Sequence, residues 1–174
     1  MVVGDRAYEV DCVIFATGYE VGVSGVVSGT LPVYGRGGEP LLQAWAQGPR
    51  TLHGFYSHGF PNLFHLGPLQ NASSVNFVHI LQEQAGHIAA VVAEARKRGA
   101  ERIEPSARAE REWVETVTAL APDTYAFQAE CTPGYYNREG MPRPGAAAYG
   151  PGPVAFHDLL RRWRDGGGMD DVLA

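Results

Sequence analysis

The sequence G-F-P-N-L-F-H-L-G-P at residues 59–68, followed by L-Q-N-A-S-S at 69–74, leads into the longest regular apolar pattern of the chain. Apolar side chains then recur at helical spacing and predict an amphipathic helix over about 74–98. Asn71, Ser73 or Ser74 can cap its start. The apolar run at 63–66 predicts a short strand. A strand, a glycine and a helix N-terminus in succession can hold an anionic or electron-rich group, but a capped helix that meets only solvent gives the same pattern.

A second segment, D-C-V-I-F-A-T-G-Y at residues 11–19, contains a continuous apolar run over 12–16. Such a run predicts a strand buried on both faces, typical of a parallel sheet between helices. Thr17 and Gly18 follow it, and a glycine there lets the backbone approach a ligand closely. An ordinary strand followed by a glycine turn has the same sequence. Residues 7–10 predict an edge strand and 51–56 another short strand, which leaves few neighbours for a buried strand.

Two more helices are predicted, over about 107–121 and 153–165, from apolar stripes that end at Pro122 and at the glycines 166–168. With few strands and one long helix before them, they predict an α/β fold whose second half is mainly helical. Glycine and proline account for 22 and 12 of the 174 residues, and they cluster in loops at 22–38, 48–68 and 133–153.

Composition argues against several classes of protein. The net charge is −5, with no basic cluster for a polyanion, so we expect no nucleic acid partner. No apolar stretch approaches the roughly 20 residues that cross a bilayer, so we expect no membrane partner. The N-terminus has no signal-peptide pattern. We therefore expect a cytoplasmic, reducing environment in which Cys12 and Cys131 are free thiols.

The common catalytic patterns are absent from the sequence. There is no Walker loop and no G-x-G-x-x-G, and no serine or cysteine can be placed in a hydrolase triad. His79 and His87 stand eight positions apart on one predicted helix, too far for a shared metal ion, so we expect no metal site.

Four segments, taken in order, resemble the flavin-containing monooxygenases and, among them, the Baeyer–Villiger monooxygenases. F-A-T-G-Y at 15–19 is similar to the Ala-Thr-Gly motif of that superfamily, and G-F-P-N-L-F at 59–64 with Gly67-Pro68 is similar to its segment near the flavin. C-T-P-G-Y-Y-N at 131–137 resembles a loop of one branch, near the enzymes that act on aryl ketones. The spacing W…GP.T..G between the first two motifs is matched by Trp45, Gly48, Pro49, Thr51 and Gly54. The resemblance covers roughly residues 5–165.

The resemblance implies the C-terminal part of an enzyme that uses FAD and NADPH to insert oxygen into a ketone through a flavin peroxide. It implies a partial FAD-binding three-layer α/β domain over 1–100, with few strands and a long helix, followed by a mainly helical C-terminal segment over 101–174. The residues expected at FAD are Ala16, Thr17, Gly18, Gly67, Pro68, Asn71 and Ser73. Those expected to border the nicotinamide and substrate are Pro133, Tyr135, Tyr136 and Asn137.

Several parts of the family pattern are missing from this sequence. Neither dinucleotide fingerprint has a counterpart, nor does the arginine that stabilises the peroxide, and Gly134-Tyr135 stands where many members carry a tryptophan. Without a β-α-β unit there is no pyrophosphate cradle, so we expect the chain alone to bind no FAD and to oxygenate nothing. Three accounts stay open. The chain can be a piece that works with a missing N-terminal flavoprotein part, a non-catalytic remnant, or a binding module that pairs with another chain.

Overall fold

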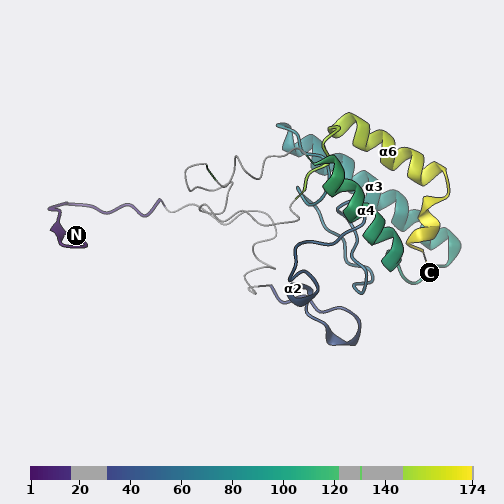
Figure 1. Cartoon of the computed structure of the whole chain (residues 1–174), viewed down its shortest axis with the longest axis horizontal. Coiled ribbons are helices and arrows are strands. Elements are labelled where there is room, and N and C mark those ends of the chain that lie inside the picture. The colour runs from purple at the N-terminus through teal and green to yellow at the C-terminus, as the bar shows by residue number, and fades with distance from the viewer. Residues whose placement is uncertain (17–30, 122–129, 131–146, 174) are drawn as a thin grey trace.

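The structure is a computed structural model that describes residues 1–16, 31–121, 130 and 147–173. Three long helices dominate the described part: α3 (Phe77–Arg98), α4 (Ala107–Leu120) and α6 (Pro153–Asp165). They lie side by side at one end of the molecule (Figure 1). Their ranges confirm the three predicted helices to within three residues. Two 3-10 turns, η1 (Arg36–Gly38) and η3 (Gly168–Asp171), and a short helix, α2 (Leu41–Ala44), were not predicted.

The helix ends follow the capping rules, with one change of residue. Ser106 caps α4 by accepting a hydrogen bond from the N–H of Ala109 at 3.1 Å. The cap of α3 is Asn76, whose side chain accepts from the N–H of His79 at 3.1 Å. The prediction of Asn71, Ser73 or Ser74 as this cap was wrong, because the chain stays irregular until Asn76.

The main core lies where the three helices meet the loop 52–72. Each helix contributes most of its predicted apolar face, with Val91 of α3, Val117 of α4 and Phe156 of α6 almost fully buried. Phe77 and Leu120, which the same stripes include, are exposed. Phe55 and Tyr56 of the loop fill the centre between them. Burying an aromatic or aliphatic side chain of this size stabilises the fold by about 1.5–3 kcal/mol. A second, smaller core forms around α2 from Leu41, Trp45, Phe60 and Leu69.

The predicted strands are mostly wrong. The described residues contain one sheet, an antiparallel pair of two-residue strands, β1 (Val2–Val3) and β2 (Arg6–Ala7). Residues 12–16 form no strand and are exposed, Ile14 by 84% and Phe15 by 86%. A strand buried on both faces needs a neighbouring strand along each edge, and no strand among the described residues lies beside 12–16. Residues 8–10 and 63–66 form no strand either.

The run 51–56 is a tight loop rather than a strand. It closes on itself through an isolated bridge between Leu52 and Tyr56, with His53 and Gly54 at positive φ. The structure is thus a small α/β fold dominated by helices, and the three-layer FAD-binding arrangement stays a prediction. No helix in the described ranges combines the length and apolar character that a bilayer crossing needs.

Candidate functional site

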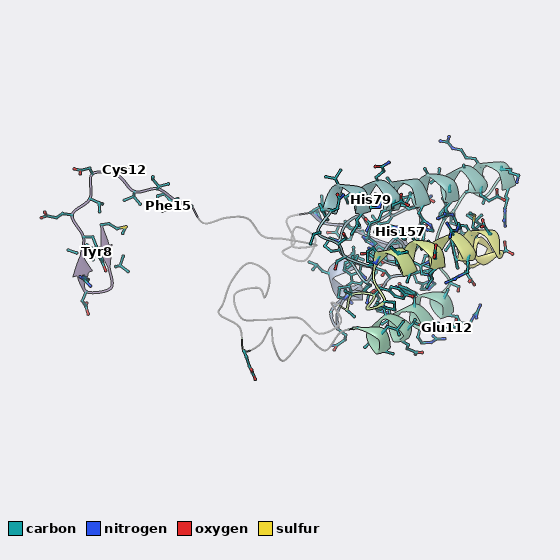
Figure 2. The ribbon with its side chains drawn as sticks, turned by 90° about the horizontal axis from the view of Figure 1, so that it is seen from above. Tyr8, Cys12, Phe15, His79, Glu112 and His157 are labelled. Atoms are coloured by element: carbon teal, nitrogen blue, oxygen red, sulfur yellow. The ribbon has the colours of Figure 1, made fainter. Side chains whose placement is uncertain are left out.

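The predicted site residues fall into three groups. Gly67, Pro68, Asn71 and Ser73 lie together in the loop that precedes α3, called here the 66–76 loop. Ala16 is exposed at the end of the N-terminal segment, and Figure 2 shows its neighbour Phe15 well away from the helices. The described residues therefore do not bring Ala16 to the 66–76 loop. The remaining predicted residues lie outside the described residues: Thr17, Gly18, Pro133, Tyr135, Tyr136 and Asn137.

The backbone of Gly67 is fixed to α3 by one buried side chain. Gln84 accepts a hydrogen bond from the Gly67 N–H at 2.9 Å and donates to the Gly67 carbonyl at 3.2 Å. The amide of Asn71 donates to the same carbonyl at 2.8 Å. Gly67 has a φ of 111°, a conformation that favours glycine. Asn71 is buried and turned inward, whereas Pro68 and Ser73 are exposed.

Gln70 ties the 66–76 loop to α4 and to residues 49–51. Its carbonyl accepts from the indole N–H of Trp113 at 3.0 Å. Its side chain accepts from the Thr51 hydroxyl at 2.7 Å and donates to the Pro49 carbonyl at 2.9 Å. Pro49 and Thr51 belong to the W…GP.T..G spacing. In this chain their hydrogen bonds to the Gln70 side chain hold the 66–76 loop on its buried side.

Gly54, the last glycine of that spacing, lies against the same loop. A Cβ built on Gly54 would be 2.0 Å from the carbonyl oxygen of Leu69 and 2.6 Å from the amide nitrogen of Asn71. The backbones of the two segments therefore approach more closely than any side chain permits. This close approach joins two parts of the chain, whereas the approach to a ligand predicted at Gly18 falls outside the described residues.

The outward side of the 66–76 loop and the start of α3 form an exposed apolar surface, called here the α3 entry surface. It consists of Leu66, Pro68, Val75, Phe77 and Val78, all exposed. In the described ranges, the N–H groups of Phe77 and Val78 have no acceptor. A rigid loop, apolar side chains and two free N–H donors at the positive end of a helix fit the edge of a flat, electron-rich ring system such as a flavin.

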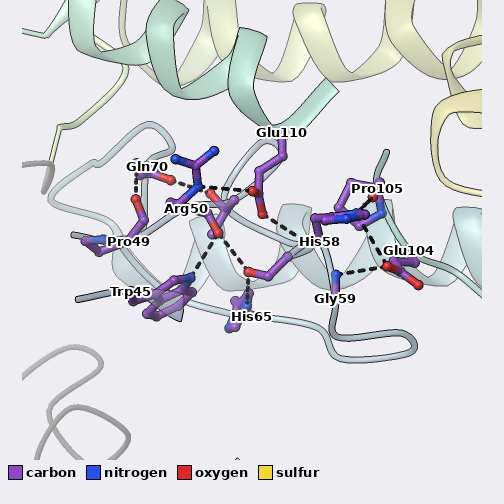
Figure 3. Close-up of polar contacts among 12 residues, drawn as sticks. Trp45, Pro49, Arg50, His58, Gly59, His65, Gln70, Glu104, Pro105 and Glu110 are labelled. Carbon is purple, nitrogen blue, oxygen red and sulfur yellow. Dashed lines mark hydrogen bonds and ion pairs between the residues drawn. The ribbon is translucent and has the colours of Figure 1, made fainter. Parts of the chain in front are cut away.

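A second polar network fixes the G-F-P-N-L-F segment to the loop before α4 and to α4 itself (Figure 3). Glu110 accepts from the N–H of His58 at 2.8 Å and from Arg50 Nε at 3.3 Å. Glu104 accepts from the N–H of Gly59 at 2.9 Å and pairs with Arg36 at 2.6 Å. The two carboxylates thus satisfy the N–H groups of His58 and Gly59, where the motif begins, so they help to set its shape.

Sequence reasoning missed Gln84 and Glu110, although a signal for both exists. Gln84 stands in the buried stripe of α3 with Ile80, His87 and Val91, and Glu110 stands in that of α4. A polar residue in an apolar stripe is buried by the helix geometry and needs a partner. In each case the partner is the backbone of a motif loop.

Two buried histidines, His53 and His87, and the half-buried His65 are held neutral. Burial lowers the pKa of His53 to about 3 and that of His65 to about 4. Burial, and then the charge of Arg164, lower the pKa of His87 to about 3. His53 lies edge-on to both Trp113 and Trp163. With the side chains as they stand, no three histidine, cysteine, aspartate or glutamate residues in the described part of the chain are grouped so that they could hold a metal ion.

No family model matches the chain. It is 58% identical over its whole length to a "Baeyer-Villiger monooxygenase" of Streptomyces coelicolor, of which it covers 29%. It is 42% identical, over 99% of its length, to the "Neopentalenolactone D synthase" of Streptomyces avermitilis, of which it covers 30%. The chain thus spans less than a third of these relatives.

Solved structures of monooxygenases also match nearly the whole chain. The "Polycyclic Ketone Monooxygenase" of Thermothelomyces thermophila superposes on 98% of the chain with a TM-score of 0.84 and 31% identity, and the match covers 29% of that protein. An "Oxidized steroid monooxygenase bound to NADP" superposes on 95% of the chain with a TM-score of 0.75 and 27% identity.

Proposed function

We propose that this chain is the C-terminal part of a flavin-dependent Baeyer–Villiger monooxygenase, because it is homologous over its whole length to part of such enzymes. The proposed activity is FAD- and NADPH-dependent insertion of oxygen into a ketone. The observation that carries the proposal is the 58% identity over the full chain, together with an α3 entry surface whose chemistry suits a flavin. The proposal includes a cytoplasmic location and the division into segments 1–100 and 101–174.

The described residues would act on FAD by position. When bound, FAD would accept a hydride from NADPH and react with oxygen. Gly67, Pro68 and the 71–74 turn would face the isoalloxazine. The side chain of Asn71 points inward instead and supports the Gly67 carbonyl. The N–H groups of Phe77 and Val78 would donate to a ring oxygen, favoured by the helix dipole. The apolar side chains around them would exclude water from the ring.

The other predicted residues complete the proposal. Ala16, Thr17 and Gly18 would approach FAD from the N-terminal segment. Pro133, Tyr135, Tyr136 and Asn137 would border the nicotinamide and the ketone, where the tyrosines can stack or hydrogen-bond. Because the chain has no dinucleotide fingerprint, the pyrophosphates of FAD and NADPH would be held by the rest of the protein.

The exposed segment 12–16 favours assembly with that remaining part. Ile14 and Phe15 are large apolar side chains that lie almost entirely in solvent. A run of this kind pairs readily with the edge of a sheet. We propose that it joins the sheet of the FAD-binding part. The alternative, a binding module that pairs with a separate flavoprotein chain, uses the same surfaces and is distinguished by the experiment below.

A chimera tests the proposal. The homologous segment of the Streptomyces coelicolor relative is replaced by this chain, and the FAD content and the NADPH-dependent oxygenation of a ketone are measured. We expect a yellow, active protein, whereas the chain alone shifts no flavin absorption band. A folded chimera without FAD contradicts the proposal. FAD without oxygenation favours the non-catalytic alternatives.

Two matched variants of the chimera test the α3 entry surface. Val78 and Val154 are each the second residue of a helix and each 75% exposed. An aspartate at either position affects its own helix similarly. Val78→Asp places a negative charge against the electron-rich flavin edge and should lower FAD content at least about tenfold, the effect of about 1.4 kcal/mol. Val154→Asp should leave FAD content unchanged. Equal effects would remove the surface from the proposal.

A further inference from the structure

Two histidines from different helices lie beside each other on the surface. The ring centroids of His79, in the first turn of α3, and His157, in the second turn of α6, are 5.9 Å apart, and their planes cross at 76°. Figure 2 shows both labelled where the two helices run side by side. The sequence places His79 on the same helix as His87, two turns away. The fold instead gives His79 a neighbour from a helix 78 positions later.

The separation suits a shared metal ion. Imidazole nitrogens bind zinc at about 2.0–2.1 Å, so two rings on one ion keep their centroids roughly 5–6.5 Å apart. His79 is exposed and His157 half-buried, so both rings can turn their nitrogens toward a common point without disturbing the core. In the described ranges neither imidazole has a hydrogen-bond partner that would hold it back.

A carboxylate lies on the same face of α3 as His79. Glu83 follows His79 by four positions on α3, and residues four apart share one face of a helix. It is exposed and has no ion pair within the described residues. Glu83 and His157 also line one pocket of about 220 Å³ between the two helices, whose other walls are Gly86, His87, Leu160 and Arg164. Arg164, a wall of this pocket, follows His157 by two turns of α6, about 10 Å by the helix rise. Arg161, one turn after His157, is paired with Asp158.

We propose that His79 and His157 bind a divalent transition-metal ion such as Zn²⁺, Ni²⁺ or Cu²⁺, with Glu83 as a third ligand after a change of rotamer and water in the remaining positions. Imidazole with a single carboxylate suits these ions, whereas Ca²⁺ and Mg²⁺ prefer all-oxygen sites. The bound ion would clamp the first turn of α3 onto α6. The site uses none of the residues proposed to contact flavin, and its test needs no flavin.

Zinc titration of the purified, chelator-treated chain tests the proposal. We expect one Zn²⁺ per chain by calorimetry, and a melting temperature that rises with zinc because the folded state alone holds the site. His79→Asn and His157→Asn should each weaken binding at least about tenfold, because each removes one of two imidazole ligands. Magnesium should have no effect. Hydrogen exchange in the first turn of α3 should slow when zinc is added.

Controls separate this site from others. Glu83→Gln should weaken binding, and Glu112→Gln on α4 should not, although both change one exposed glutamate. Because the thiols of Cys12 and Cys131 can bind zinc themselves, the titration is repeated on the Cys12→Ser/Cys131→Ser protein. Zinc binding that is absent, or that survives both histidine substitutions in that protein, overturns the proposal. An unaltered melting temperature of the metal-free variants shows that their loss of affinity is not a loss of folding.

Discussion

Nη1 of Arg164 lies 2.8 Å from Nδ1 of His87, a contact that joins α6 to α3. Arginine only donates, so Nδ1 accepts and His87 carries its proton on Nε2, which lies 3.0 Å from the hydroxyl of Tyr56. A surface cation thus fixes the tautomer of a core histidine.

Replacing Arg164 by methionine keeps the length of the side chain and removes this donor. The buried acceptor of His87 then has no partner, which costs about 1–3 kcal/mol in the free energy of unfolding. Arg162→Met is the control, because Arg162 is exposed on the same helix and should change stability by less than about 0.5 kcal/mol. Urea unfolding of both variants measures the difference. Equal effects would mean that the contact with His87 contributes nothing.

Stability should fall as the solution is acidified. His53, His65 and His87 have folded-state pKa values of about 3 to 4, below the ordinary value of 6.5. The unfolded chain therefore binds protons first, so the stability that these groups contribute is fully present above pH 6.5 and is lost as pH falls through 6.5 to about 4 for His65 and about 3 for His53 and His87. Between pH 7.5 and pH 5 the loss should be about 1–2 kcal/mol for each histidine. Urea unfolding at several pH values measures it, and a flat profile would contradict the burial of these rings.

The carboxylate of Glu110 should matter more than others on its helix. It is 5% exposed and satisfies the N–H of His58, so Glu110→Ala leaves that group unpaired and costs about 2–3 kcal/mol. Glu112→Ala, two residues later, removes only an exposed pair with Arg108 and should cost under about 0.5 kcal/mol. Thermal unfolding compares them. Similar midpoints for the two variants would show that the network of Figure 3 does not stabilise the motif.

Two glycines at positive φ should respond differently to alanine. At Gly54 the new Cβ would lie 2.0 Å from the carbonyl oxygen of Leu69, so Gly54→Ala should cost more than about 3 kcal/mol or prevent folding. At Gly99, the C-cap of α3, nothing lies within 4 Å, and Gly99→Ala should cost about 1 kcal/mol from its backbone conformation alone. Expression yield and chemical unfolding of the two variants measure this difference in stability. If Gly54→Ala destabilises the protein as little as Gly99→Ala does, the 66–76 loop can move to make room for the new Cβ.

The helices could be predicted because their signals are local. The stripe of Trp113, Val117 and Leu120 lies within one stretch of chain, and α4 forms where it predicts. The strand predicted at 12–16 does not form, because its local signal is not sufficient. An apolar run becomes a strand only beside partners, and partners are set by the whole fold. The loop at 51–56 was mistaken for a strand because its tight turn depends on contacts with Leu69 and Gln70.

The motifs identify only part of what shapes the candidate site. Gly67 and Pro68 lie in the 66–76 loop that precedes α3, and their contact with FAD stays a prediction. The motif residues themselves mostly contact their own chain. Asn62, for example, exchanges backbone and side-chain hydrogen bonds with Ile103. Side chains such as Gln84 determine the loop geometry, and no motif names them because their partners are backbone atoms.

The hydrogen bonds of Gln84, Trp113 and Thr51 have a consequence for any molecule that meets the 66–76 loop. They immobilise its backbone before an encounter takes place. The loop is thus preorganised, and a partner that docks there forfeits little conformational entropy on the protein side. Substitutions at these three residues should therefore weaken association by loosening the free protein, even though none of the three belongs to the exposed surface.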